Sequence, residues 1–127
     1  MTVPPDLEGG PAPSDTANSV IPDPWRIDWA YLATLGDAPR LVLDTNRGTV
    51  VVRLDTDEAP QTVQTVARLA QAGKYDGVPF HRVVPNFVVQ GGDPRGDGYG
   101  GADFTLRTEV FPFHWTEDGL IGMASAG

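Results

Sequence analysis

The fold of this chain is decided by residues 80–93, which read FHRVVPNFVVQGGD. Two runs of β-branched and aromatic residues, 80–84 and 87–90, flank the pair Pro85-Asn86. Such residues fill a pleated, half-buried surface, whereas a Pro-Asn pair is typical of a turn or a bulge. The stretch therefore predicts two strands that fold back on each other at this pair.

Arg82 and Gln90 place a guanidinium and a carboxamide in these apolar strands. Alternation puts Phe80 and Arg82 on one face of the strand and His81 on the other. A bulge at the Pro-Asn pair would bring Arg82, Phe87 and Gln90 together over a shallow apolar groove. The alternatives are a surface salt bridge for Arg82 and a hydrogen bond to loop backbone for Gln90.

Composition narrows the class of protein. The length of 127 residues suggests a single domain. A formal charge of −8, with nine scattered Lys and Arg residues, argues against nucleic-acid binding. The absence of cysteine excludes disulfides, thiolate nucleophiles and Cys-ligated metals. No signal peptide is recognisable and no apolar run approaches the roughly 20 residues that span a bilayer, so we expect a soluble domain of unknown compartment that does not contact membranes.

The first part of the chain predicts a linker and one short helix. Residues 1–22 are rich in Pro, Gly, Ser and Asp, which indicates a flexible linker with another domain before it. Residues 23–36 predict an amphipathic helix that Asp23 and Pro24 begin and Gly36 ends. Its apolar positions recur at helical spacing: Trp25, Trp29 and Leu32. These are expected to face the core, and the alternative is an exposed binding patch of two tryptophans.

The middle of the chain predicts a hairpin followed by a helix. Apolar residues alternate with a period of two on both sides of a short loop at residues 46–48, which indicates a hairpin. A helix is expected to begin at Pro60 and to end at Gly73. Its apolar face is formed by Val63, Val66, Ala67, Leu69 and Ala70. The residues Tyr75-Asp76-Gly77 then predict a turn.

The last part of the chain predicts more strands. We expect a glycine-rich loop at residues 91–101, an interrupted strand at 103–110, an aromatic loop at 111–115 and a buried strand at 119–124. Strands dominate, and one clear helix lies between the strand pairs. This order favours a mainly β fold, an antiparallel barrel with helical cover, over a βαβ sheet.

Several other kinds of site are disfavoured by spacing. His81 and His114 are expected to be hydrogen-bonded structural histidines rather than metal ligands. Residues 123–127 lack the first glycine of a serine nucleophile elbow, and no helix follows them. The glycines at 96–101 do not have dinucleotide-binding spacing, and the aspartates of this loop are too widely spaced for a calcium loop.

Residues 80–93, the glycine-rich loop and residues 122–127 (GMASAG) resemble the cyclophilin family of peptidyl-prolyl cis/trans isomerases. The preceding hairpin, the helix that begins with proline and the Gly-Lys-Tyr-Asp-Gly turn follow the family order from about Arg40. The resemblance implies a cyclophilin-like antiparallel β-barrel over residues 37–127. This barrel is expected to be incomplete at its C-terminus, because the family continues into further strands, and the chain is expected to be part of a longer protein.

The resemblance also implies roles for individual residues. It makes Arg82, Phe87 and Gln90 the catalytic residues, with the latter two lining a proline pocket and holding the peptide backbone. Further substrate contacts are implied at Phe80, His81, Val88, Met123, Ala124 and Ser125. Val88 stands where the family often has methionine, and Ser125 where asparagine is commoner.

The implied activity is rotation of X-Pro bonds during protein folding, without metal or cofactor. Proline-containing peptides or unfolded protein segments would be the substrates, and cyclosporin-like cyclic peptides would bind the same pocket. One alternative is a non-catalytic module that binds proline-containing segments. Another is a scaffold fragment that packs on a neighbouring domain through Trp25 and Trp29.

Overall fold

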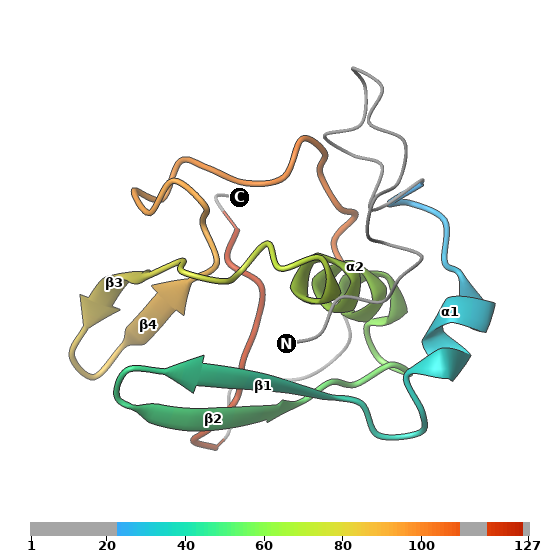
Figure 1. Cartoon of the computed structure of the whole chain (residues 1–127), viewed down its shortest axis with the longest axis horizontal. Helices are drawn as coiled ribbons and strands as arrows, with labels where there is room; N and C mark the ends of the chain where they lie inside the picture. Colours follow the sequence, from blue (N-terminus) through green and yellow to red (C-terminus); the bar gives the residue numbers. More distant parts are fainter. Residues whose placement is uncertain (1–22, 110–116, 126–127) are drawn as a thin grey trace.

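The computed structural model describes residues 23–109 and 117–125. The predicted linker, the predicted aromatic loop and His114 lie outside these residues. The described elements are, in order, α1 (Trp29–Thr34), β1 (Arg40–Thr45), β2 (Gly48–Arg53), α2 (Pro60–Gln71), β3 (Phe80–Val84) and β4 (Val88–Gly91) (Figure 1). The strands form two antiparallel pairs, β1–β2 and β3–β4.

The β1–β2 hairpin confirms the prediction from alternating residues. Its register runs from Arg40 opposite Arg53 to Thr45 opposite Gly48, so the connecting loop is Asn46-Arg47. The Thr45 hydroxyl donates to the Gly48 carbonyl at 2.6 Å and accepts from the Arg47 N–H at 3.1 Å. These local bonds tie the ends of the two strands together.

Helix α2 begins and ends where the sequence predicts. Proline fits its first turn because the N–H that proline lacks has no partner inside the helix. At the other end Gly73 has a φ of 74° and its N–H donates to Ala70 O at 3.0 Å, while the Lys74 N–H donates to Leu69 O at 2.9 Å. This pair of bonds is the Schellman motif, in which a left-handed residue favours glycine.

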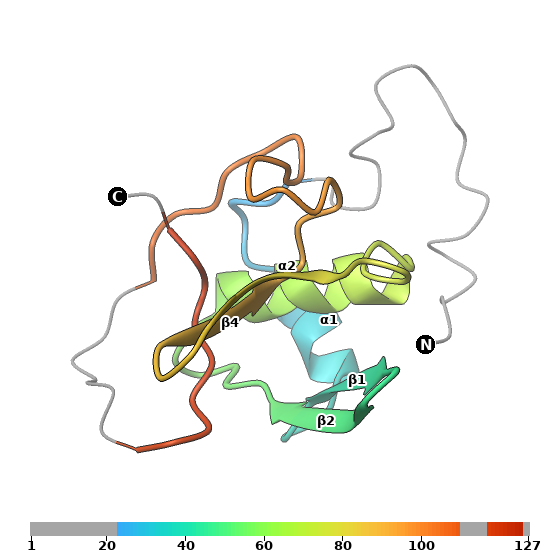
Figure 2. The ribbon, with the colours of Figure 1, turned by 90° about the vertical axis from the view of Figure 1, so that its left-hand side faces the viewer.

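The core is small and surrounds α2. Its buried apolar side chains are Leu32, Val63, Ala67 and Ala70. Buried polar side chains of the same helix accompany them: Gln61, Gln64, Thr65 and Arg68. Figures 1 and 2 show α2 between the β1–β2 hairpin and the long loop that follows β4. Among the described helices none is long and apolar enough to cross a membrane.

Helix α1 is shorter than predicted and begins at Trp29, not at Asp23-Pro24. Its N-cap is Asp28, whose carboxylate accepts from the Tyr31 N–H at 2.9 Å. Trp25 and Trp29 are 50% and 60% exposed, so the predicted buried stripe is wrong for both tryptophans. Only Leu32 of that stripe is buried.

Side chains of α2 explain why the helix does not start earlier. The Gln64 side chain is fully buried, accepts from the Asp28 N–H at 2.8 Å and donates to Arg26 O at 2.7 Å. Gln61 donates to Trp25 O at 3.0 Å. These bonds occupy the backbone of residues 25–28 in a non-helical conformation. The segment before β1 is therefore fixed to α2 by polar contacts.

The strand predicted at residues 103–110 is absent over the described part, 103–109, which is irregular. Its backbone bonds to side chains instead of to a partner strand. The Trp25 indole donates to Thr105 O at 2.6 Å, and the Arg107 N–H donates to the Gln61 amide oxygen at 3.1 Å. Non-local side chains thus take the place of a partner strand for part of this segment.

The strand predicted at residues 119–124 is also wrong, because this segment is irregular and pairs with no described strand. Ile121 and Met123, expected to be buried, are 64% and 61% exposed. The described residues therefore show two β-hairpins and two helices, and they do not show a closed barrel.

Candidate active site

The turn between β3 and β4 sets the register of the site. The Phe87 N–H donates to Val84 O at 3.1 Å, with Pro85 and Asn86 between them. Proline at the second position and a residue of positive φ at the third, here Asn86 at 59°, suit a type II turn. The predicted turn is confirmed, whereas the bulge lies between Phe80 and Arg82 and not at the Pro-Asn pair.

This register brings together the three residues that the sequence singles out. Arg82 lies directly opposite Gln90, and its Nη1 donates to the Gln90 Oε1 at 3.4 Å. The Arg82 Cζ lies 5.6 Å from the centre of the Phe87 ring. Because Phe87 belongs to the turn and not to β4, strand alternation does not direct its ring to the other face.

We call the surface formed by Arg82, Val84, Val88, Gln90 and the ring of Phe87 the Arg82 face. Cross-strand pairing places the first four side chains on one side of the hairpin, and Val83 and Val89 on the other. Val88 and Gln90 are half-buried, whereas the Phe87 side chain is 74% exposed. The Arg82 face is therefore open, and it offers an aromatic ring beside a cation.

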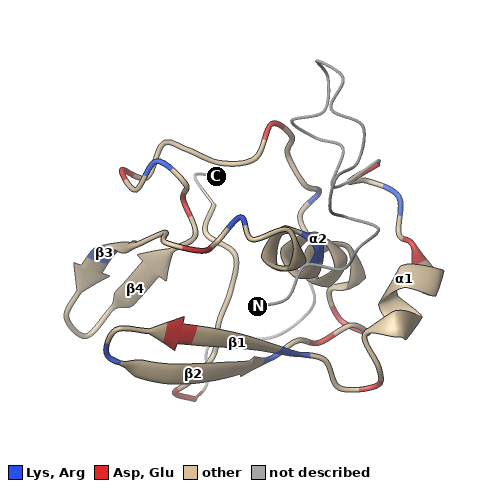
Figure 3. Ribbon diagram, viewed as in Figure 1, with Lys and Arg blue, Asp and Glu red and all other residues tan. Residues whose placement is uncertain are grey.

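The guanidinium of Arg82 is not neutralised by a carboxylate in the described part of the chain. The two ion pairs found there are Arg68–Asp28 and Arg95–Asp97. Figure 3 shows one basic segment on β3 and no charged residue on β4. The salt-bridge alternative for Arg82 is therefore wrong within these residues. Its contact with Gln90 uses one of five N–H donors and leaves the others for a ligand.

Two residues of β3 with implied substrate contacts differ in their surroundings. The Phe80 ring lies against Gly91, where an added methyl group would meet Phe80 Cδ1 at 2.7 Å. Both ring nitrogens of His81 are buried and find no hydrogen-bond partner among residues 23–109 and 117–125. The prediction of a hydrogen-bonded His81 is therefore wrong there.

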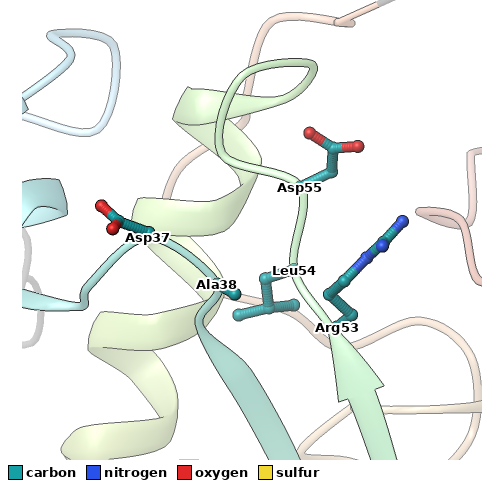
Figure 4. A pocket seen from close by; sticks show the side chains of 5 residues that line it. All are labelled: Asp37, Ala38, Arg53, Leu54 and Asp55. Carbon is teal, nitrogen blue, oxygen red and sulfur yellow. The ribbon is translucent and has the colours of Figure 1, made fainter.

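The implied contacts near the C-terminal end remain predictions. Met123, Ala124 and Ser125 are exposed and lie in irregular backbone. A hollow lies away from the Arg82 face, beside the ends of β1 and β2, lined by Asp37, Ala38, Arg53, Leu54 and Asp55 (Figure 4). The Asp37 side chain points away from those of Arg53 and Asp55, so the three charged groups do not converge (Figure 4). Over the residues described, no three His, Cys, Asp or Glu side chains gather to hold a metal ion.

Sequence reasoning missed the structural importance of Asp93, which it weighed only as a calcium ligand. Burial of the Asp93 carboxylate raises its pKa, but backbone hydrogen bonds from Arg95, Gly98, Gly100 and Asp97 outweigh burial and hold the pKa well below its usual range. An aspartate followed by Pro and several glycines is a signal for such side-chain-to-backbone bonds. That signal was available in the sequence.

Comparison with known proteins shows which family this sequence belongs to. The family model for cyclophilin type peptidyl-prolyl cis-trans isomerases matches residues 40–127. The chain belongs to the cyclophilin family. The match includes both hairpins, α2 and the whole Arg82 face. The segment that contains α1 lies before it.

Relatives of this cyclophilin carry isomerase names. Peptidyl-prolyl cis-trans isomerase ppi1 of Schizosaccharomyces pombe is 44% identical over 92 residues, which are 67% of this chain and 57% of that protein. Peptidyl-prolyl cis-trans isomerase-like 1 of Homo sapiens is 35% identical over 113 residues, 86% of this chain and 61% of that protein. A putative bifunctional phosphatase/peptidyl-prolyl cis-trans isomerase of Streptococcus pyogenes is 39% identical over 94 residues, 70% of this chain and 20% of that protein.

The chain thus spans less than two thirds of the length of these curated relatives. No solved structure matches it.

Proposed function

We propose that this cyclophilin catalyses the cis/trans isomerisation of X-Pro peptide bonds and that Arg82 is its principal catalytic residue. One observation carries the proposal: the Arg82 guanidinium, which pairs with no carboxylate among residues 23–109 and 117–125, faces Gln90 and lies beside the exposed Phe87 ring. Family membership and the names of the relatives support it.

The reaction is a rotation about the X-Pro peptide bond, and it breaks no covalent bond. Resonance makes rotation about a peptide C–N bond cost about 18–20 kcal/mol, and X-Pro isomers are nearly balanced in free energy. The obstacle is therefore kinetic, and no bond to carbon has to be broken. As the amide twists, its nitrogen gains lone-pair character, and a guanidinium N–H that donates to it or to the neighbouring carbonyl favours the twisted state.

The Arg82 face provides the parts for this step. In the proposal, the Phe87 ring and Val88 hold the proline ring, while Gln90 binds the peptide backbone. The bond of 3.4 Å between Arg82 and Gln90 is long, so a bound carbonyl readily replaces it. Phe80, His81, Met123, Ala124 and Ser125 would extend the contact along the peptide.

The proposed substrates are proline-containing peptides and unfolded protein segments. An open face suits them, because an extended chain must enter from solvent and leave again. We propose that cyclosporin-like cyclic peptides occupy the same face, and that they slow isomerisation in competition with linear peptides. We also propose that the two hairpins are walls of one antiparallel barrel in the whole protein, with Val83 and Val89, now 63% and 62% exposed, turned away from the Arg82 face.

The test is the rate of cis/trans exchange of a proline-containing peptide, followed by NMR exchange spectroscopy. Removal of one preorganised donor typically costs about 10²-fold or more in rate, so we expect Arg82→Ala to lose about 10²-fold in kcat/KM. Arg82→Lys keeps the charge without the planar fork and should recover only part of the rate. Arg53→Ala removes an exposed arginine of β2 and is the matched control.

Equal rates for Arg82→Ala and Arg53→Ala would refute the role of Arg82. Peptide binding without any acceleration by the wild type would instead support the non-catalytic binding module. The two results are distinguishable because binding is read from chemical-shift changes in the same samples.

A further inference from the structure

Asp93 organises the glycine-rich loop that follows β4. Its side chain is buried, with 7% of the residue exposed. The carboxylate accepts from the backbone N–H groups of Arg95 at 2.8 Å, Asp97 at 3.0 Å and Gly98 at 2.6 Å. The Gly96 N–H donates to the Asp93 carbonyl at 2.9 Å. One residue therefore satisfies most of the polar backbone in this turn.

The loop closes tightly on this carboxylate at Gly100. A methyl group added at Gly100 would lie 2.0 Å from the Asp93 Oδ1 and 2.8 Å from the Arg95 Cγ. Side-chain carbons essentially never approach closer than 3.0 Å, so only glycine fits here. The conformation of the loop from residue 93 to residue 100 is thus set by one anion and by close backbone approach.

The anchored loop packs against β3 at the point where its pairing is irregular. A methyl group at Gly98 would lie 3.7 Å from the His81 Nε2, and one at Gly96 would lie 3.3 Å from the Pro79 Cγ. His81 is the extra residue of the bulge between Phe80 and Arg82. Bulged residues lose ladder hydrogen bonds, so neighbouring structure must hold the strand there.

We propose that Asp93 is a positioning residue for Arg82: it holds the loop that braces the bulge one residue before the catalytic guanidinium. It also fixes the chain three residues after Gln90, so it supports both sides of the Arg82–Gln90 contact. Asp93 does not touch the peptide in this scheme. The inference rests on the proposed isomerase function.

The experiment is a double-mutant cycle between Asp93 and Arg82 in the full chain. Asp93→Asn keeps the shape of the side chain but turns an amide NH₂ toward backbone donors, which releases part of the loop. Misplacement of a catalytic group by about 1 Å can cost about 10²-fold in rate, so a partial shift should cost about 10-fold in kcat, with KM changed less than about twofold. Asp103→Asn, an equal loss of charge at an exposed site beyond the loop, is the control and should keep the wild-type rate.

The cycle separates positioning from general loss of structure. In the Arg82→Ala background, Asp93→Asn should cause no further loss, because groups that act through one another are not additive. The same tenfold loss in both backgrounds would overturn the inference while leaving the proposed function intact. Unchanged activity in Arg82→Ala itself would instead overturn the proposed function, and with it the inference.

A second variant covers the case in which Asp93→Asn fails to fold. Gly98→Ala keeps the carboxylate and strains the loop where it meets His81, at a φ of 90°. It should show a loss of kcat that also disappears in the Arg82→Ala background. The Arg82 Nε–H resonance should shift in Gly98→Ala and not in Asp103→Asn, and an unshifted resonance would count against the inference.

Discussion

Replacement of Gln64 by leucine tests how the segment before β1 is held. The Gln64 side chain has no exposed surface and makes two hydrogen bonds to the backbone of this segment, to Asp28 N and to Arg26 O. Leucine has a similar volume, so the substitution removes both bonds without opening a large cavity. The expected result is a loss of stability caused by two unpaired backbone groups.

The size of the stability loss in Gln64→Leu follows from the two backbone groups that lose their hydrogen-bond partner, Asp28 N–H and Arg26 C=O. Each buried donor or acceptor left without a partner costs about 1–3 kcal/mol. The two backbone groups are only part-buried, so water restores some of the bonding. The lower end of the range therefore applies to each, and we expect a total loss of about 2 kcal/mol. Gln71→Leu removes a single side-chain bond, with the Tyr31 hydroxyl, and should cost about 0.5–1 kcal/mol.

Urea unfolding followed by circular dichroism measures both variants. The midpoint should fall while the dependence of the free energy on urea stays unchanged, which shows that the effect lies in stability and not in the surface exposed. A loss for Gln64→Leu no larger than that for Gln71→Leu would refute the reasoning. It would mean that the two bonds to residues 26 and 28 together contribute no more than one side-chain bond.

Two other predictions concern charge. The Glu109 carboxylate accepts from the Gln61 and Thr62 N–H groups at 3.0 and 2.6 Å at the start of α2, so Glu109→Gln should lower the unfolding free energy by about 1 kcal/mol, whereas Glu58→Gln should not. The pKa of Asp28 is lowered by hydrogen bonding to Tyr31 N–H and by Arg68, which outweigh burial, and that of Asp93 is lowered by its loop. Both carboxylates bind protons more weakly when folded, so their contribution is complete above their ordinary value of 3.8 and is lost as the pH falls below it. Unfolding midpoints from about pH 6 to about pH 3 should therefore fall less steeply for Asp28→Asn and Asp93→Asn than for the wild type, and identical slopes would contradict this.

Local signals allowed much of the fold to be predicted. The β1–β2 hairpin follows from alternation on both sides of the short loop predicted at residues 46–48, and α2 follows from Pro60, its apolar spacing and Gly73. These features depend on residues near one another in sequence. Two of the failures depend instead on residues far away in the sequence. Residues 25–28 and 103–109 bond to side chains of α2, and nothing in their own composition records those distant partners.

Buried polar residues of α2 account for the errors at residues 25–28 and 103–109. Gln61 and Gln64 lie at 4% and 0% exposure, although a hydropathy pattern assigns such residues to solvent. Each is buried because its amide forms hydrogen bonds with backbone groups of the segments beside α2. Among the described residues, those backbone groups have no partner strand or helix of their own. The apolar face of α2 was predicted correctly in Val63, Ala67 and Ala70, but the polar half of its interface was not.

The sequence predicts that Arg82 and Gln90 meet, but it attributes the meeting to a bulge at the Pro-Asn pair. The bulge lies between Phe80 and Arg82 instead. The turn at Pro85-Asn86 pairs Val84 with Val88, and counting back along both strands pairs Arg82 with Gln90. A strand that slips by one residue presents its other face, so this turn alone decides that the two polar side chains meet. The bulge lies on the far side of the Arg82–Gln90 pair from the turn. It therefore shifts the register only of Phe80, which pairs with Gly91. The register of the Arg82 face is therefore protected from the irregularity beside it, while the direction in which β3 continues is not. That division explains why a loop anchored by Asp93 is needed at His81 and why none is needed at the turn.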